Sequence, residues 1–177
     1  MLNITQISSF MDKYLVPKNK NLVRFGILPV EAVISVFKEI ESMPNGSHVK
    51  PMIEAFGHLI STAGNLKLRT FIVHGTTCKC CGIPATFFAV EYDKNDPEKA
   101  IILNLYSIHE NGKEILMNMD HRLPRFRGGA DCVENMQTMC QPCNLKKGCK
   151  LIFTEGGISK KELKAQSKQQ AARSKKL

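Results

Sequence analysis

The sequence predicts an α+β protein in which helices come first and strands follow. Two observations predict this class. Apolar residues recur at helical spacing through residues 1–70, and beyond Leu66 runs of β-branched and aromatic residues, separated by turn-like sequences, replace that pattern. At 177 residues, the chain can form one ordinary domain, or a small catalytic unit with an appendage.

The N-terminal part is predicted to be a small helical region over residues 1–70. Its three apolar patterns cover residues 4–15, 30–40 and 52–63. Pro17 follows the first pattern, whereas Pro29 and Pro51 precede the other two, as expected of a residue favoured in the first turn of a helix. We expect this region to supply the surface for any protein partner; the oligomeric state is not indicated by the sequence.

A second domain is predicted over residues 71–153 and begins with a β-hairpin. Its strands are 85–92 and 101–106, with the turn-like sequence DKNDPEK between them. An Asn-Gly turn then leads to a third strand, EILMNMDH, which ends on Asp120 and His121. A long loop containing Gly-Gly, a short strand over 135–139 and a helix over 142–147 follow.

The charge of the chain indicates a polyanionic partner without identifying one. The formal net charge is +9, and residues 151–177 hold seven Lys and Arg against two Asp and Glu. This basic tail, residues 154–177, is rich in Lys, Gln, Ser and Ala, a composition that suits either a solvated helix or a disordered segment.

Cysteine content and apolar runs indicate the compartment. The chain has seven cysteines, and its start, MLNITQISSFMDK, shows neither a basic leader nor a sustained apolar run. We therefore expect a cytoplasmic protein in a reducing compartment, with no membrane partner. In that setting, two cysteines separated by two residues indicate a metal site before a disulfide.

Four cysteines have the spacing of a structural zinc site. Cys78 and Cys81 form one Cys-x-x-Cys pair, and Cys140 and Cys143 form another. Cys80 is a rival ligand in the first pair, and buried free thiols are the alternative interpretation. Four thiolates would leave no open position for water, so such a zinc would be structural and catalysis must lie elsewhere. Cys132 and Cys149 have no partner at that spacing.

The end of the third strand carries the groups that phosphodiester hydrolysis needs. His121 can serve as a general base, because a neutral imidazole accepts a proton near neutral pH. Asp120 and Asn144 offer oxygen ligands to a divalent cation, Mg²⁺ or Mn²⁺. Asn135 lies at the end of the loop, where its amide can bond backbone groups and hold the loop that follows His121.

With these groups in this order, residues 78–148 resemble the HNH endonuclease family. The motifs that carry the resemblance are Asp-His, Gly-Gly, Asn135 and Cys-x-x-Cys-Asn-x-x-Lys-Gly. The resemblance implies a ββα-metal core with a four-cysteine zinc, His121 as general base, Asp120 and Asn144 as metal ligands and Asn135 as the Asn that orders the loop. The last motif residue is often His in this family and is Asn144 here.

A DNA endonuclease that nicks or cuts both strands is therefore the function we expect. Basic side chains near the motif are candidates for phosphate contacts, although charged loop residues are as often simply solvated: Arg122, Arg125, Arg127, Lys146 and Lys147. The chief alternative is a zinc-stabilised nucleic-acid-binding module without catalysis. A third option is an RNA-directed or protein-partnered role in which the helical N-terminal region docks to another protein. The sequence does not distinguish DNA from RNA, and it indicates no sequence preference because no base-reading motif is recognisable.

Overall fold

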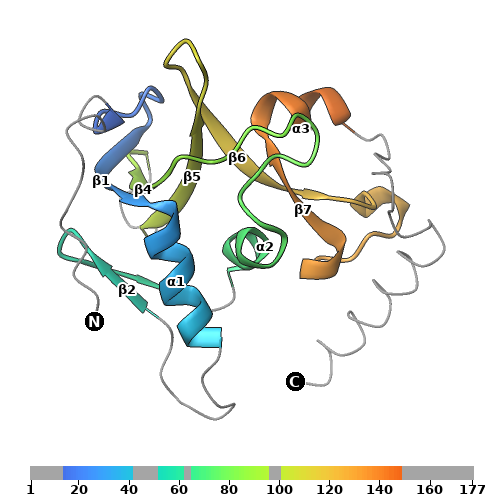
Figure 1. Ribbon diagram of the computed structural model, residues 1–177, viewed down its shortest axis with the longest axis horizontal. Coiled ribbons are helices and arrows are strands. Elements are labelled where there is room, and N and C mark those ends of the chain that lie inside the picture. Colours follow the sequence, from blue (N-terminus) through green and yellow to red (C-terminus); the bar gives the residue numbers. More distant parts are fainter. Residues whose placement is uncertain (1–13, 42–51, 62–64, 96–100, 149–177) are drawn as a thin grey trace. The chain divides into compact units, whose positions relative to one another are not determined.

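The computed structural model describes residues 14–41, 52–61, 65–95 and 101–148 (Figure 1). The tail over 154–177, and the helix expected over 4–15 except for its last two residues, lie outside the described residues.

The chain forms two compact units. We refer to Met1–Asn65 with Ala85–Leu116 as the sheet unit, and to Leu66–Pro84 with Met117–Leu177 as the cysteine unit.

Antiparallel strands form the sheet unit. Their order is β1 (Leu22–Pro29), β4 (Phe87–Asp93), β5 (Ile102–Ile108) and the start of β6 (Glu114–His121). Helix α1 (Val30–Glu41) packs against β1 and β4 and buries Val33 and Phe37. The predicted hairpin of β4 and β5, the strand β6 and the helix α1 are confirmed, as is the α+β class.

A buried polar cluster crosses the strands of the sheet unit. The Arg24 guanidinium donates from Nε to Glu91 at 2.7 Å and from Nη1 to Glu114 at 2.9 Å. Asn104 and the Tyr106 hydroxyl donate to the other Glu91 oxygen, at 2.8 and 3.0 Å. Because the side chains of Arg24 and Glu91 are fully buried, these bonds replace the hydration that both charges lose.

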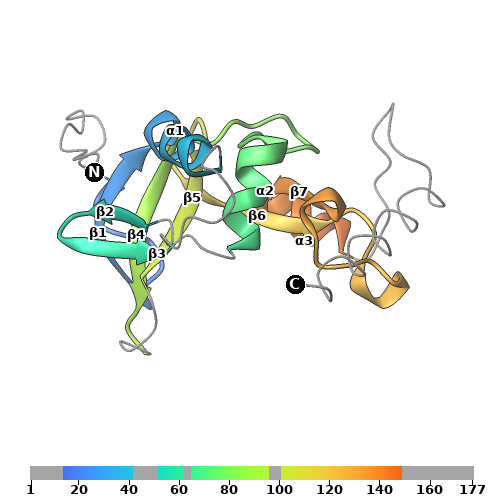
Figure 2. The same cartoon turned by 90° about the horizontal axis from the view of Figure 1, so that it is seen from below.

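The helix expected over residues 52–63 is wrong. This segment is a hairpin of β2 (Met52–Ala55) and β3 (His58–Ser61), visible side by side in Figure 2. Phe56 and Gly57 make the turn with φ of 52° and 76°, left-handed values that no helix continues. The Phe56 ring also fills the space beside Gly26, where a Cβ would lie 2.2 Å from it. The local apolar spacing therefore did not indicate either the left-handed turn or this contact with Gly26.

Residues 1–70 are accordingly not a helical region, because β1, β2 and β3 lie within them. Strand β1 was missed because its buried Arg24 interrupts the apolar pattern. Helix α2 (Leu66–His74) was also missed, since it buries only Leu68, Thr70 and Phe71. The predicted domain boundaries, 1–70, 71–153 and 154–177, and a protein partner for residues 1–70 stay predictions.

A strand pair followed by a helix forms the cysteine unit. Strand β6 ends beside β7 (Met136–Cys140), with Asp120 opposite Gln137 and His121 opposite Met136, and α3 (Gln141–Lys147) follows directly. Helix α2 packs against β7. The short strand and the helix predicted here are both confirmed. None of the described helices has the length and apolar character needed to cross a membrane.

Candidate active site and metal centre

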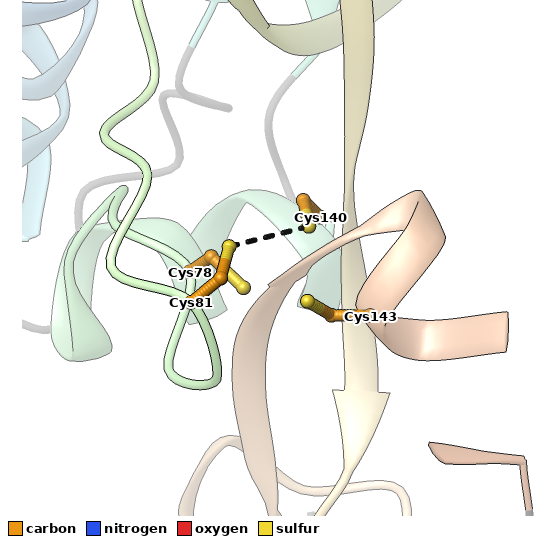
Figure 3. Close-up of side chains that lie close together, drawn as sticks. All are labelled: Cys78, Cys81, Cys140 and Cys143. Carbon is orange, nitrogen blue, oxygen red and sulfur yellow. Dashed lines mark hydrogen bonds between the residues drawn. The ribbon is translucent and has the colours of Figure 1, made fainter. Parts of the chain in front are cut away.

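Four cysteine sulfurs converge in the cysteine unit. The Sγ atoms of Cys78, Cys81, Cys140 and Cys143 all lie within 4.8 Å of one another, and those of Cys81 and Cys140 are 3.7 Å apart (Figure 3). Zinc with Zn–S bonds of about 2.3 Å in a tetrahedron separates its sulfurs by about 3.8 Å. The cluster therefore fits a structural zinc ion.

A tight turn presents the first cysteine pair. The backbone N–H of Cys78 donates to Ile83 at 2.9 Å, and that of Gly82 donates to Cys78 at 3.0 Å. Gly82 has a φ of 76°, which glycine adopts without strain. The turn is attached to β7 because the N–H of Lys79 donates to the Thr138 carbonyl at 2.9 Å, which brings it beside the second pair.

The second pair lies where β7 becomes α3. Cys140 is the last residue of β7 and the N-cap of α3, so Cys143 follows on the first turn of the helix. Burial raises the pKa of Cys140 to about 11. At Cys78 burial also raises the pKa, but backbone hydrogen bonds from Cys140, Cys81 and Cys80 lower it to about 7. A cation bound among the four sulfurs would favour the thiolate form of each.

Cys80 is not part of the cluster, although its position in the sequence made it a rival ligand. Among the described residues, the sulfurs that lie within 4.8 Å of one another are those of the two Cys-x-x-Cys pairs. Cys132 is buried apart from them, and Cys149 lies outside the described residues. The four-cysteine assignment is the arrangement that the structure supports.

Asp120 is a buried carboxylate at the end of β6. Gln137, its partner across the strand pair, donates to Oδ2 at 2.7 Å. The Lys147 ammonium donates to both carboxylate oxygens, at 3.0 and 2.7 Å, and to the His121 carbonyl at 2.6 Å. Asp120 is therefore directed toward helix α3, on the strand face opposite to that of its neighbour His121.

Asn144 lies on the α3 surface near Lys147. Residues three apart on a helix are neighbours on its surface, and Lys147 contacts Asp120. Asn144 is half-buried, and its backbone carbonyl accepts a bond from Gly148 at 3.0 Å. The structure thus brings the helix that carries Asn144 to the carboxylate of Asp120.

Asn135 holds the loop that connects β6 to β7. Its Oδ1 accepts a bond from the Leu123 N–H at 2.9 Å, and its Nδ2 donates to the carbonyls of Leu123 and Ala130 at 3.0 and 2.9 Å. The loop is closed so tightly that a Cβ on Gly129 would lie 1.7 Å from the Leu123 oxygen. Asn135 is buried and so acts on the backbone of the loop.

His121 faces this loop rather than helix α3. Its Nε2 lies 2.6 Å from Oδ1 of Asp131. Arg125 donates to the same carboxylate through Nε and Nη2, both at 2.8 Å. Hydrogen bonds from Arg125 and His121 hold the pKa of Asp131 below its ordinary value. The ring is half-buried, whereas Asp131 and Arg125 are exposed.

Comparison with known families identifies this segment. A model of the HNH endonuclease family matches residues 106–150, which contain Asp120, His121, Asn135 and Asn144. The chain carries an HNH segment. The match begins after the first cysteine pair, and neither a curated protein nor a solved structure matches the chain. The HNH match indicates a nuclease or nucleic-acid-binding function.

Basic residues of the HNH segment differ in their exposure. Arg125, Arg127 and Lys146 are exposed and Arg122 is half-buried. The Arg127 guanidinium lies 5.3 Å from the centre of the exposed Phe126 ring. The phosphate contact expected of Lys147 needs correction: its side chain is 1% exposed because the ammonium pairs with Asp120.

Two contacts of the HNH segment were missed at the level of sequence. Gln137 is recognisable only from the β6–β7 register, which places it opposite Asp120. No sequence pattern indicated a role for Asp131. Its partners His121 and Arg125 precede it by ten and six residues, in a loop without periodicity. Both residues contact the side chains on which the expected chemistry depends.

Proposed function

We propose that the protein is a metal-dependent endonuclease that hydrolyses phosphodiester bonds in DNA. One observation carries this proposal: strand β6 ends on Asp120 and His121, which have separate polar partners, within a segment that matches HNH endonucleases. Hydrolysis requires a base for water and a cation for the growing negative charge, and these two side chains provide for the two needs separately.

His121 acts as the general base in this proposal. Its ring takes a proton from water, the hydroxide oxygen bonds to phosphorus, and the bond from phosphorus to the 3′ oxygen breaks with its electrons on that oxygen. A second water returns a proton to the 3′ oxygen. Asn135 supports the step by fixing the loop that contains the partner of the ring.

Asp120 and Asn144 would hold a divalent ion, Mg²⁺ or Mn²⁺. Carboxylate and amide oxygens suit these hard cations, and the proposal is supported by the contact of α3, the helix that carries Asn144, with Asp120 through Lys147. The ion would stabilise negative charge on the phosphate and the leaving oxygen. The four-cysteine cluster supports α3 from its N-terminal end, because Cys140 and Cys143 flank the first turn of the helix and Asn144 follows directly.

DNA would be held by phosphate contacts from Arg122, Arg125, Arg127 and Lys146. Their exposure in the loop and on α3 supports this, and the net charge of +9 favours a polyanion. We place the zinc-supported HNH fold in a cytoplasmic, reducing compartment, where its cysteines stay reduced.

A second candidate is a zinc-stabilised nucleic-acid-binding module without catalysis. The contact between Lys147 and Asp120 favours it, since the ammonium bonds both oxygens of the expected metal ligand. In a catalyst the cation and the ammonium would share this carboxylate. In a binding module the ion pair would simply stabilise the fold.

A plasmid assay distinguishes the two candidates. Supercoiled DNA is incubated with the full chain and Mg²⁺ or Mn²⁺, next to the His121→Ala variant and a chelator control. If the protein is an endonuclease, the wild-type chain should convert the plasmid to relaxed or linear product. No such product should form with His121→Ala or in the presence of the chelator. Binding of DNA without cleavage under either ion would favour the module, and cleavage that survives His121→Ala would refute the role of His121.

A further inference from the structure

The His121 ring is held from one side by a pair of charged loop residues. Asp131 Oδ1 lies 2.6 Å from Nε2 of the ring. The same oxygen accepts a bond from Arg125 Nε at 2.8 Å, and Oδ2 accepts one from Nη2 at 2.8 Å. A bidentate contact of this kind between a guanidinium and a carboxylate fixes the plane of the carboxylate as well as its position.

The chemistry of the carboxylate determines which ring nitrogen carries hydrogen. An ionised carboxylate only accepts hydrogen bonds, so the nitrogen that faces it must be an N–H donor. The bonds from Arg125 and His121, which lower the pKa of Asp131, keep it ionised at neutral pH. In a neutral imidazole, the other nitrogen, Nδ1, then carries the lone pair.

We propose that Asp131 is a positioning residue for His121, which holds the ring with Nε2 as donor and leaves Nδ1 to accept the proton of water. The inference rests on the proposed function for its catalytic consequence. Arg125 has a part in it, because its guanidinium orients the carboxylate. When the ring takes the proton, the O–H bond of water breaks, an N–H bond forms at Nδ1, and Asp131 stabilises the imidazolium.

The loop fold supports this arrangement. Asp131 directly follows Ala130, whose carbonyl accepts a bond from Asn135 at 2.9 Å. The His121 strand end is joined to the far end of the loop by the bond from the Arg122 N–H to the Asn135 carbonyl at 2.7 Å. Asn135 therefore connects the backbone beside the base with the backbone beside its positioning residue.

Asp131→Asn removes the charge with almost no change in shape, and Glu134→Gln is the matched control. Glu134 is an exposed acid in the same loop, so its variant loses the same charge three residues away. Single-turnover nicking rate, DNA affinity, zinc content and Tm are measured for the full chain and both variants. The ring tautomer of His121 is assigned from ¹⁵N-histidine NMR spectra at about pH 8, above the ordinary pKa of histidine.

For Asp131→Asn we expect a fall of about 10- to 100-fold in the nicking rate, with DNA affinity unchanged or higher because a negative charge is lost. In the full chain the spectra should show His121 with hydrogen on Nε2, and Asp131→Asn should reduce that population. Glu134→Gln should leave rate and tautomer unchanged. The His121→Ala variant identifies the His121 signals.

Two results would overturn the inference: a wild-type ring with hydrogen on Nδ1, or an Asp131→Asn rate within about twofold of the Glu134→Gln rate. A protein that does not nick DNA at all would instead refute the proposed function. The NMR result would in that case still decide whether Asp131 fixes the ring.

Discussion

The Lys147 ammonium and the Asp120 carboxylate form a buried ion pair, with Nζ 2.7 Å from Oδ2 and 3.0 Å from Oδ1. The side chains are 1% and 9% exposed. The neighbouring Lys146 is exposed on the same helix. Two adjacent lysines of the HNH segment therefore differ in environment: Lys147 is buried in an ion pair with Asp120, and Lys146 is exposed to solvent.

Lys147→Met should destabilise the protein by about 3 kcal/mol, because Asp120 loses the cation that compensates its burial. Since Lys147 is not exposed, its loss should leave the salt dependence of DNA binding unchanged. Chemical denaturation measures the first effect, and DNA affinity at several salt concentrations measures the second.

Lys146→Met is the matched control and should behave in the opposite way. Its stability should stay within about 0.5 kcal/mol of wild type. The slope of log affinity against log salt should become shallower by about 1, as expected for one lost phosphate contact. Equal salt slopes for Lys146→Met and the wild-type chain would contradict a phosphate contact by Lys146.

Zinc content should depend on the clustered cysteines and not on Cys80. Cys143→Ser removes one ligand, so we expect zinc to be lost and Tm to fall by about 10 °C, because structural zinc binding contributes directly to folding. Cys80→Ser, in the same turn but outside the sulfur cluster, should keep about one zinc per chain. Elemental analysis and thermal unfolding measure both variants. A Cys143→Ser protein that retains its zinc would refute the four-cysteine site.

Asn135→Asp tests the bonds that close the loop. The variant keeps the acceptor for the Leu123 N–H but replaces the amide that donates to the carbonyls of Leu123 and Ala130. A buried carboxylate facing two carbonyl oxygens should cost about 3 kcal/mol, measured by chemical denaturation.

Asn111→Asp is the control for that change, because its Oδ1 accepts a bond from the Lys113 N–H in an exposed turn and the variant keeps it. Its stability should stay close to that of the wild-type chain. If Asn135→Asp proved equally harmless, the loop would not depend on the Asn135 amide.

The sequence predicted the part of the HNH segment whose signals are local. The signals are local for the strand that ends on Asp120 and His121, for the two Cys-x-x-Cys pairs and for the helix expected over 142–147. The structure has the strand and the cysteine cluster where expected, and the helix begins one residue earlier, at Gln141. The partner of Asp120 could not be predicted in the same way. Lys147 was expected on the surface because a lysine late in a short helix usually lies there, whereas in the structure α3 packs on β7 and the Lys147 ammonium reaches Asp120.

The predictions from sequence that were wrong in the sheet unit have a similar physical origin. Residues 52–61 have apolar spacing that suits a helix, yet they form the β2–β3 hairpin, and the ring of Phe56 at its turn lies against Gly26, thirty residues away in the chain. Arg24 is a buried charge within an apolar strand. The residues that compensate its charge, Glu91 and Glu114, come from strands that are far from it in sequence. Apolar periodicity cannot detect a buried charge whose compensation is non-local.

Arg24→Met tests that compensation in the sheet unit. The variant keeps much of the side-chain volume but leaves Glu91 fully buried without its cation, with only Asn104 and Tyr106 still donating to it. Stability should fall by about 3–5 kcal/mol in chemical denaturation, whereas Lys20→Met, at an exposed position, should change it by less than about 0.5 kcal/mol. Because the bonds of Arg24 lie in the sheet unit, the folded variant should keep its zinc. A loss of stability below about 1 kcal/mol would show that Glu91 does not need the guanidinium, and that the neutral donors alone compensate its burial.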